Sequence, residues 1–299
     1  MRAKPDTEQR RAGDAARSRL VAATTAAERR LDLAGTSTAV LEAGDGPPIV
    51  FLQGEFAEVW VRVFPGLKRT HRVIAADLPG LGASTAPTGR LDADTVLTWL
   101  DQLIEKTCAG APTLVGKGLG GAAATRFAAR HSNRLERLVL VDSLGLGRFR
   151  PPPGMALTFL AVLLRPTERT LERSFRNYCF VDLDEMRREM GEVYQWVADY
   201  AVDRFRTPSV RTSMRHLMKT FGSAIPPEDL TRITVPTTLI WGRHDVGAPL
   251  EIAEAASDRY GWPLHIIEDA RDDPGLERPD EFLHALATAI AATEGSSAR

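Results

Sequence analysis

Short continuous runs of apolar residues are the main pattern along this chain. Continuous runs are typical of strands that are buried on both faces, as in parallel sheets. The predicted strands cover residues 49–52, 72–76, 112–115, 138–141, 237–241 and 263–267. Two further strand-like runs, 30–35 and 37–42, surround a glycine turn near the N-terminus.

The segments between these strands have the apolar periodicity of helices. Residues 1 to about 15 are polar, and we expect no regular structure there. The predicted helices cover residues 15–30, 94–107, 121–131, 250–260 and 279–292. Alternation of strands and helices predicts the α/β class, with a mostly parallel central sheet flanked by helices.

Residues 151–221 break the alternation and predict about four helices, with Thr167 and Thr207 as N-caps. This stretch lies between the fourth and fifth parallel strands. We therefore expect an all-helical lid over the carboxyl edge of the sheet, where open α/β sheets bind ligands. The expected organisation is an N-terminal extension and helix (1–30), a core (31–147 and 226–299) and a lid (148–225).

Composition and charge exclude several classes of protein. The chain of 299 residues is 43% hydrophobic and 26% charged, as in globular proteins. Its net charge of -1 argues against nucleic-acid and membrane binding, which need a basic surplus. Cys108 and Cys179 are too few for a disulfide framework or a zinc cluster, and residues 1–19 lack the apolar core of a secretory signal. We therefore expect a cytoplasmic protein with reduced thiols.

A glycine-rich turn, residues 116–121, follows a predicted strand and opens a helix. Its glycines fit the G-x-G-x-x-G dinucleotide fingerprint, with Asp142 as a ribose ligand. They also fit the nucleophile elbow G-x-S-x-G, with Gly118 in place of the serine. Placement favours the elbow, because a dinucleotide fingerprint normally follows the first strand of its domain.

The order of several motifs resembles the α/β-hydrolase superfamily, specifically its lidded, epoxide-hydrolase- or esterase-like members. The resemblance covers roughly residues 31–290 and implies the α/β-hydrolase fold. It is carried by the strand and oxyanion-loop segment 46–54, the D-x-P-G-x-G-x-S turn at 77–84, the elbow at 116–121, the acid-bearing strand at 235–245, and the H-x-P-x-x-E-x-P-x-x-F-like stretch at 272–282.

The same resemblance implies that the machinery of acyl transfer is missing. Gly118 stands in the nucleophile position and Asp272 in the histidine position. Gln53 replaces the oxyanion-loop histidine and is a candidate pocket residue, while the acid Asp245 is retained. A serine hydrolase needs an activated hydroxyl and a base to take its proton. We therefore expect no Ser-His-Asp hydrolysis.

The groups that remain predict a different chemistry. The resemblance places the backbone amides of Glu55 and Leu119 in an oxyanion hole, which does not depend on the serine. It also places Asp245 and Asp272 opposite each other as the candidate catalytic pair. Two carboxylates that are close together share a proton and titrate as a pair. Such a pair can act as general acid and general base in one cycle.

Several neighbouring residues have two interpretations. Lys117 is a pocket candidate, although the expected orientation is outward, into a surface ion pair. Glu55 either adds charge to the pocket or caps a helix over 57–63. Ser143 would line the pocket as a hydrogen-bonding group, and Trp196 belongs to an apolar stripe that either packs in the lid or contacts ligand.

Several functions remain open. The first is an enzyme that needs neither a cofactor nor a metal, and that acts on a mostly apolar small molecule as a lyase, isomerase, cyclase or hydratase. The second is an inactive pseudo-hydrolase that binds a small molecule or a partner protein. A hydrolase in which a carboxylate activates water directly is a lesser alternative, and a nucleotide-binding oxidoreductase is disfavoured. We expect a small-molecule partner, no nucleic acid and no membrane; the sequence leaves the oligomeric state open.

Overall fold

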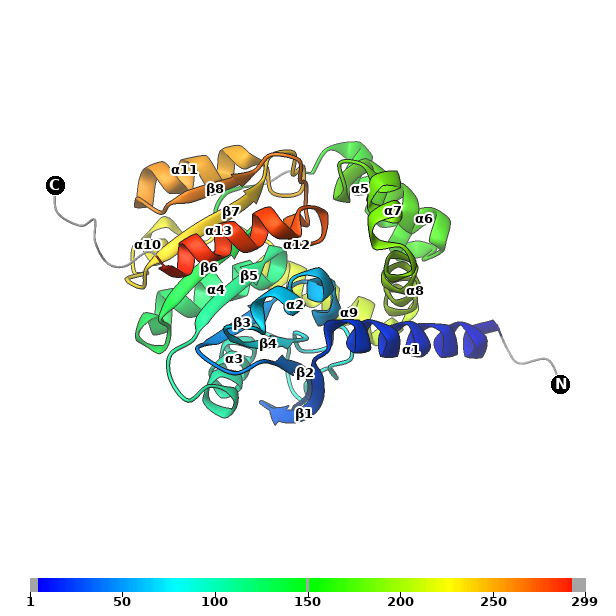
Figure 1. The fold of residues 1–299 in the computed structure, drawn as a ribbon, viewed down its shortest axis with the longest axis horizontal. Coiled ribbons are helices and arrows are strands. Elements are labelled where there is room, and N and C mark those ends of the chain that lie inside the picture. The colour runs from blue at the N-terminus through cyan, green and yellow to red at the C-terminus, as the bar shows by residue number, and fades with distance from the viewer. Residues whose placement is uncertain (1–4, 149–150, 292–299) are drawn as a thin grey trace.

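An eight-stranded sheet lies at the centre of the molecule, with helices on both of its faces (Figure 1). The computed structural model describes residues 5–148 and 151–291, with side chains from residue 12. The strands are β1 (Ala27–Leu33), β2 (Thr36–Ala43), β3 (Pro48–Leu52), β4 (Arg72–Ala76), β5 (Thr113–Lys117), β6 (Arg137–Val141), β7 (Thr237–Gly242) and β8 (Leu264–Ile267).

Helices connect most of these strands. The α-helices are α1 (Pro5–Thr24), α2 (Phe64–Leu67), α3 (Ala93–Thr107), α4 (Gly118–His131), α5 (Pro153–Leu164), α6 (Glu168–Ser174), α7 (Leu183–Met190), α8 (Glu192–Arg206), α9 (Pro208–Phe221), α10 (Pro227–Leu230), α11 (Leu250–Tyr260), α12 (Pro274–Glu277) and α13 (Pro279–Ala291). Two short 3-10 segments, η1 (Ala57–Arg62) and η2 (Ser132–Arg134), and one π-helical turn, η3 (Phe175–Cys179), complete the secondary structure of the described residues.

The strand order is β1-β2-β4-β3-β5-β6-β7-β8. All pairings from β4 to β8 are parallel, whereas β1 and β2 are antiparallel. The predicted fold class, α/β with a mostly parallel sheet, is therefore confirmed. One face of the sheet packs on α3, α4 and α11, and the other on α2, α12 and α13. Burial on both faces explains the continuous apolar runs of the central strands.

The helix predicted over 15–30 is wrong at both ends. Helix α1 begins at Pro5, in a stretch expected to lack regular structure, and ends at Thr24. The chain turns at Thr25, whose φ is 55°, and enters β1 at Ala27. Helix α1 is stabilised by tertiary packing that the sequence pattern does not contain: Ala16 and Leu20 are buried in a cluster shared with α8 and η1.

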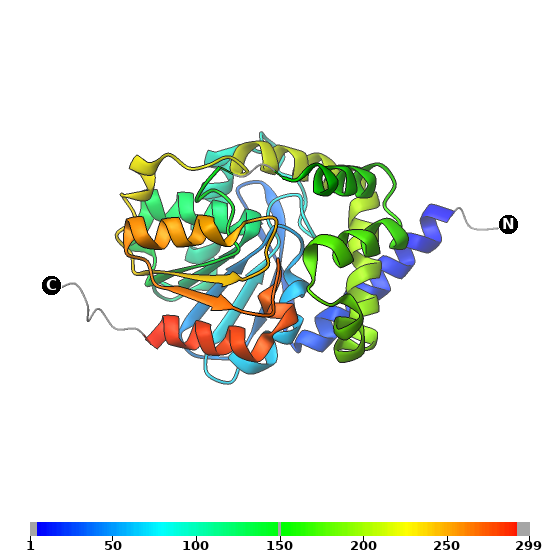
Figure 2. The ribbon, with the colours of Figure 1, turned by 90° about the horizontal axis from the view of Figure 1, so that it is seen from above.

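Helices α5 to α9, with the turn η3, form a helical insertion between β6 and β7. Figure 2 shows this insertion beside the sheet, with α1 lying along it. It contains five α-helices rather than the predicted four. Thr167 caps α6 by accepting a hydrogen bond from the Thr170 amide, as the sequence predicts. In the described parts of the chain, no helix is both long and apolar enough to cross a bilayer.

Candidate functional site

Lys117, the last residue of β5, lies at the centre of a cluster of carboxylates. Its Nζ lies 3.2 Å from Asp273 Oδ2, 3.3 Å from Glu55 Oε1 and 3.8 Å from Asp272 Oδ2. The side chain is only 2% exposed, so the expected outward orientation is wrong. The reason is tertiary: β5 lies between β3 and β6 and is buried along its whole length.

The carboxylates keep Lys117 positively charged. Burial by itself lowers the pKa of a lysine, but the charges of Asp272, Asp273 and Glu55 outweigh it and raise this pKa well above its usual value. The site therefore contains a fixed cation at neutral pH. Among the described residues no group of His, Cys, Asp or Glu side chains is placed to hold a metal ion. The cation at the centre of this cluster is the Lys117 amine.

Asp245 and Asp272 come together at the carboxyl edge of the sheet. A Cβ atom built on Gly247 would lie 3.2 Å from Asp245 Oδ1 and 4.0 Å from Asp272 Oδ1, so both carboxyl groups border the same space. Asp245 Oδ1 accepts a hydrogen bond from the Gly247 amide, 2.6 Å away, and Oδ2 has no partner among the described residues. Burial, reinforced by the charge of Asp272, raises the pKa of Asp245 to about 8.

Asp142, which follows β6, is a third carboxyl group near this pair. Its Oδ1 accepts a hydrogen bond from the Gly242 amide at 2.9 Å, while Oδ2 has no partner among the described residues. Burial and the charge of Asp245 raise its pKa well above the usual value. Its φ of 41° is unusual for a residue other than glycine, and such strain is concentrated at functional sites.

Asp273 is a fourth carboxyl group of the cluster and is not among the candidates that the sequence indicates. It is 5% exposed, and it caps α12 by accepting a hydrogen bond from the Leu276 amide at 3.3 Å. Burial raises its pKa to about 7, although the nearby Lys117 cation opposes the shift. The aspartate–proline step after β8 is a helix-start signal that identifies this capping position in the sequence.

Gly118 opens α4 with a φ of 52°, directly after Lys117. A Cβ atom at this position would meet no other atom within 4 Å, so there is open space where a side chain would project. The backbone of the loop after β3 lies beside it: a Cβ on Gly54 would be 3.5 Å from the Leu119 nitrogen. The structure therefore brings Gly118, Leu119 and the Glu55 segment together.

Gln53 lies in the core, whereas Glu55 adds charge to the cluster, which is one of its two interpretations. Gln53 is 1% exposed; it donates a hydrogen bond to the Ala76 carbonyl and accepts one from the Trp60 indole, so its amide holds the core rather than a pocket. Glu55 does not cap a helix, because Phe56 is the N-cap of η1. The Glu55 carboxylate instead contacts Lys117 and is partly exposed.

Ser143 and Trp196 do not face the carboxylate cluster. The Ser143 hydroxyl is buried beneath α4 and donates a hydrogen bond to the Leu144 carbonyl at 2.9 Å. Trp196 lies on α8 with the Arg19 guanidinium 5.8 Å from its ring centroid. Both residues are pocket candidates in the sequence, and packing in the lid is the alternative for Trp196. Trp196 packs against α1, which covers this side of α8, in agreement with the packing interpretation.

Cys179 is a further residue near the site, supplied by the helical insertion at the end of η3. Burial raises the pKa of its thiol well above the usual value, and the charge of Asp272 raises it further, while Lys117 lowers it. The thiol therefore stays protonated at neutral pH. A lone cysteine gives no sequence signal of such a position.

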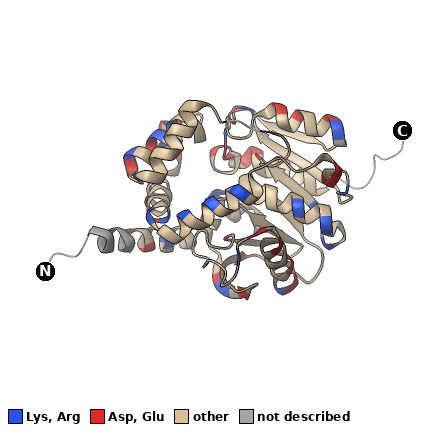
Figure 3. Ribbon diagram, turned by 180° about the vertical axis from the view of Figure 1, so that it is seen from behind, with Lys and Arg blue, Asp and Glu red and all other residues tan. Residues whose placement is uncertain are grey.

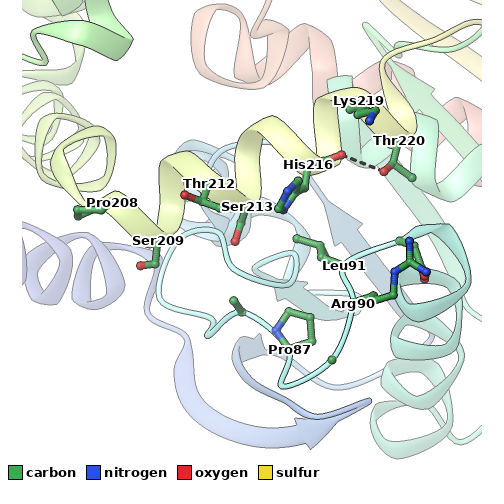
Figure 4. A pocket seen from close by; sticks show the side chains of 13 residues that line it. Pro87, Arg90, Leu91, Pro208, Ser209, Thr212, Ser213, His216, Lys219 and Thr220 are labelled. Atoms are coloured by element: carbon green, nitrogen blue, oxygen red, sulfur yellow. Dashed lines mark hydrogen bonds between the residues drawn. The ribbon is translucent and has the colours of Figure 1, made fainter.

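Two open cavities lie near the carboxyl edge of the sheet. One, of about 910 Å³, is lined by Asp245 and His244, by Arg271 after β8, and by Pro152 before α5. The other, of about 780 Å³, lies between the loop 86–92 and α9 (Figure 4). Only the first contains a predicted site residue, so the candidate site opens toward Asp245.

Comparisons with known proteins identify the family of the fold. Residues 47–273 match the family model described as alpha/beta hydrolase fold. A 2-hydroxy-6-oxo-6-(2'-aminophenyl)hexa-2,4-dienoic acid hydrolase of Metapseudomonas resinovorans is 28% identical over 273 residues, 86% of this chain and 89% of that protein. A pimeloyl-acyl-carrier-protein methyl ester esterase of Aeromonas hydrophila is 25% identical over 258 residues, 84% of this chain and 98% of that protein.

Solved structures share the fold. A 2-hydroxy-6-oxo-6-phenylhexa-2,4-dienoate hydrolase of Rhodococcus superposes with a TM-score of 0.76 at 22% identity, over 89% of this chain and 99% of that chain. The enol-lactonase of Burkholderia xenovorans superposes with a TM-score of 0.73 at 20% identity, over 88% of this chain and 100% of that chain. At these identities the superpositions show a common fold.

Proposed function

This chain belongs to the α/β-hydrolase family. We propose that it is a member of the family without the Ser-His pair. In this proposal it is a cofactor-free enzyme that moves a proton within a mostly apolar oxo compound. In this proposal Gly118 and Asp272 stand in the positions of the nucleophile and the histidine. Without a hydroxyl and a base, acyl transfer through a serine ester has no nucleophile.

The observation that carries the proposal is the Asp245–Asp272 pair. Asp245 is a buried carboxylic acid with a raised pKa of about 8 and one oxygen without a partner, so it can donate a proton near neutral pH. Asp272 borders the same space, and its Oδ2 lies 3.8 Å from Lys117 Nζ. In this proposal Asp245 is the proton donor and Asp272 is the proton acceptor.

Such a pair converts an enol into its oxo isomer. The Asp272 carboxylate accepts the proton of the enol hydroxyl, and Asp245 donates its proton to the conjugated carbon. The proton then passes from Asp272 to Asp245, which restores both groups. The negative charge that develops on the substrate oxygen is stabilised by Lys117 and by the backbone amides of Glu55 and Leu119.

The substrate class is suggested by one relative. The Metapseudomonas hydrolase is named for a dienoic acid that carries a 2-hydroxyl and a 6-oxo group, an enol conjugated with a ketone. We propose that this chain takes a related oxo compound. It would enter between the core (31–147 and 226–299) and a lid (148–225), with the extension 1–30 bracing the lid. The cavity beside Asp245 offers the route.

The first test follows the proton transfer directly. Incubation with 2-hydroxy-6-oxo-6-phenylhexa-2,4-dienoate should convert the dienol into its oxo isomer, monitored by loss of its long-wavelength absorbance. Asp245→Asn and Asp272→Asn should each lower kcat by about 100-fold or more. Asp269→Asn, an exposed residue after β8, is the matched control and should keep full activity.

Three results would contradict the proposed isomerase activity. Cleavage of the carbon chain would favour the nucleophile-independent hydrolase. Full activity in both Asn variants would remove the carboxyl pair from the reaction. Binding without turnover would favour the second candidate function, an inactive binder. The observation that favours this candidate is that three carboxylates already surround the Lys117 amine.

The second test concerns the vacant nucleophile position. The wild-type chain should not react with a fluorophosphonate probe, whereas the Gly118→Ser/Asp272→His double variant should be labelled at residue 118. The open space at Gly118 and the positive φ suit a nucleophile elbow. Gly118→Ser with Asp272 unchanged is the matched control. Stoichiometric labelling of a serine in the wild-type chain would overturn the proposed loss of the Ser-His pair.

A further inference from the structure

Helix α5 presents an apolar face to solvent. None of its 12 residues is charged. Met155, Thr158 and Val162 are buried, while the opposite face exposes Leu157 (67%), Leu160 (49%) and Leu164 (70%). These three leucines are spaced by three and four residues and therefore form one continuous stripe. No other described element covers these three leucines, so the stripe is available to an external surface.

Arginines surround the carboxyl end of this helix. Arg165 follows α5 directly. Arg206, from the end of α8, donates a hydrogen bond to the Pro166 carbonyl, and Arg211, from α9, donates one to the Leu163 carbonyl. None of these three guanidinium groups forms an ion pair with a described carboxylate. Glu168, at the start of α6, is the acidic residue nearest in sequence.

The positive charge continues along α9. Arg211, Arg215 and Lys219 are spaced by four residues, so they lie on one side of the helix, which carries no acidic residue. Figure 3 shows basic residues at intervals along this helix, which crosses the face seen from behind. Arg215 and Lys219 are exposed and lack a carboxylate partner among the described residues. The two features meet where Arg211 contacts α5.

We propose that this combined surface, the α5 leucine stripe with the basic row of α9, binds the surface of an anionic lipid bilayer. A helix with apolar residues on one side and basic residues at its border lies in the plane of the interface. Its leucines enter the acyl boundary, and the basic residues meet the headgroup phosphates. The binding is peripheral and independent of the chemistry at Asp245.

The charges favour a bilayer over a second copy of the chain. In a symmetric dimer each patch meets the same patch of the other copy, and because neither α5 nor α9 carries an acidic residue, the basic row would meet no opposite charge there. The stripe is also too small for a stable dimer. A helix of 12 residues is about 18 Å long and buries on the order of 200 Å² per copy, whereas a stable interface needs about 800 Å².

Co-sedimentation with vesicles tests the proposal. The full-length wild-type chain should bind phosphatidylcholine vesicles containing 30% phosphatidylglycerol at least tenfold more tightly than vesicles of pure phosphatidylcholine. Raising NaCl from 50 to 500 mM should weaken the binding by a similar factor, because salt screens the headgroup charges. This salt series needs no variant and therefore does not depend on how a variant folds.

Two pairs of exposed substitutions separate the contributions. Leu157→Gln/Leu164→Gln and Arg215→Gln/Lys219→Gln should each weaken binding to the anionic vesicles by about tenfold or more. Leu157→Met/Leu164→Met, which keeps the stripe apolar, and Arg259→Gln, an exposed arginine on α11, are the matched controls and should bind as the wild type does. Circular dichroism verifies that each variant is folded.

Three outcomes would overturn the proposal. The first is no sedimentation of the wild-type chain with anionic vesicles. The second is equal binding to neutral and anionic vesicles. The third is vesicle binding that both Gln pairs leave unchanged. If the wild-type chain fails to bind vesicles and instead dimerises in analytical ultracentrifugation, with loss of the dimer in Leu157→Gln/Leu164→Gln, the surface is a self-association interface and the bilayer proposal is wrong.

Discussion

At the scale of single residues, Lys117 is the side chain on which the candidate site depends. It is buried, and three carboxylate groups lie within 4 Å of its amine. The partners Glu55 and Asp272 are partly exposed and retain some hydration, whereas Asp273 is 5% exposed and depends more strongly on the amine. Removal of a charge from a buried pair leaves the other charge without compensation.

Lys117→Met should therefore lower the free energy of unfolding by about 3 kcal/mol at pH 8. The loss should be smaller at pH 5, because the buried Asp273 carboxyl, whose pKa is raised to about 7 even with the lysine present, is then protonated. Urea unfolding at both pH values measures the difference. Lys219→Met, an exposed lysine on α9, is the control and should change little. An equal loss at both pH values would contradict the role of Asp273.

At the scale of elements, helix α1 belongs to the core and does not act as a loose extension. It packs on α8 and η1, and it places Arg17 next to the buried Glu58, with Arg17 Nε 2.9 Å from Glu58 Oε1. Burial and the neighbouring Asp77 raise the pKa of Glu58 to about 8. The position of α1 therefore depends on a buried charge pair as well as on apolar contacts.

Arg17→Met should cost about 1–2 kcal/mol of stability at pH 9, because Glu58, whose pKa is about 8, is largely ionised there and would lose its cation. The double variant Arg17→Met/Glu58→Gln should recover most of the loss, since it removes the unpaired charge. Arg19→Met, on the same helix, should cost less than about 1 kcal/mol. Thermal unfolding of the three variants measures these effects, and a double variant as unstable as Arg17→Met would contradict the pairing.

At the scale of the whole molecule, several buried carboxyl groups share one direction of pKa change. Burial raises the pKa of each above its usual value. Five of them, Glu58, Asp77, Asp245, Asp273 and Glu277, have a pKa between about 6 and 8, and the pKa of Asp142 is raised well above its usual value as well. The folded chain then binds more protons than the unfolded chain between about pH 4 and pH 8, so stability falls as the pH rises through this range.

The free energy of unfolding should therefore be larger at pH 5 than at pH 9, by a few kcal/mol for about five such groups. Urea unfolding across this range measures the slope. Asp245→Asn removes one of the titrating groups and should make the profile flatter. A stability that is constant or rises toward pH 9 would contradict the prediction.

The apolar pattern determined the class of fold. The continuous runs of β3, β4, β5 and β6 exist because both faces of the sheet are covered, so a buried parallel strand leaves a direct signal in sequence. The order of the glycine turns and strands also placed Gly118, Asp245 and Asp272 at one edge of the sheet. Parallel strands end at the same edge whatever their side chains are.

Only the tertiary structure decided which side chains meet there. The orientation of Lys117, the approach of Asp142 and Asp273, and the nearby thiol of Cys179 all depend on elements distant in sequence. The distribution of surface charge also depends on the tertiary structure. A net charge of -1 is a sum over the chain, and it does not indicate that basic residues gather on α9 beside the apolar face of α5. Burial and charge partners arise from packing between elements, which local periodicity does not contain.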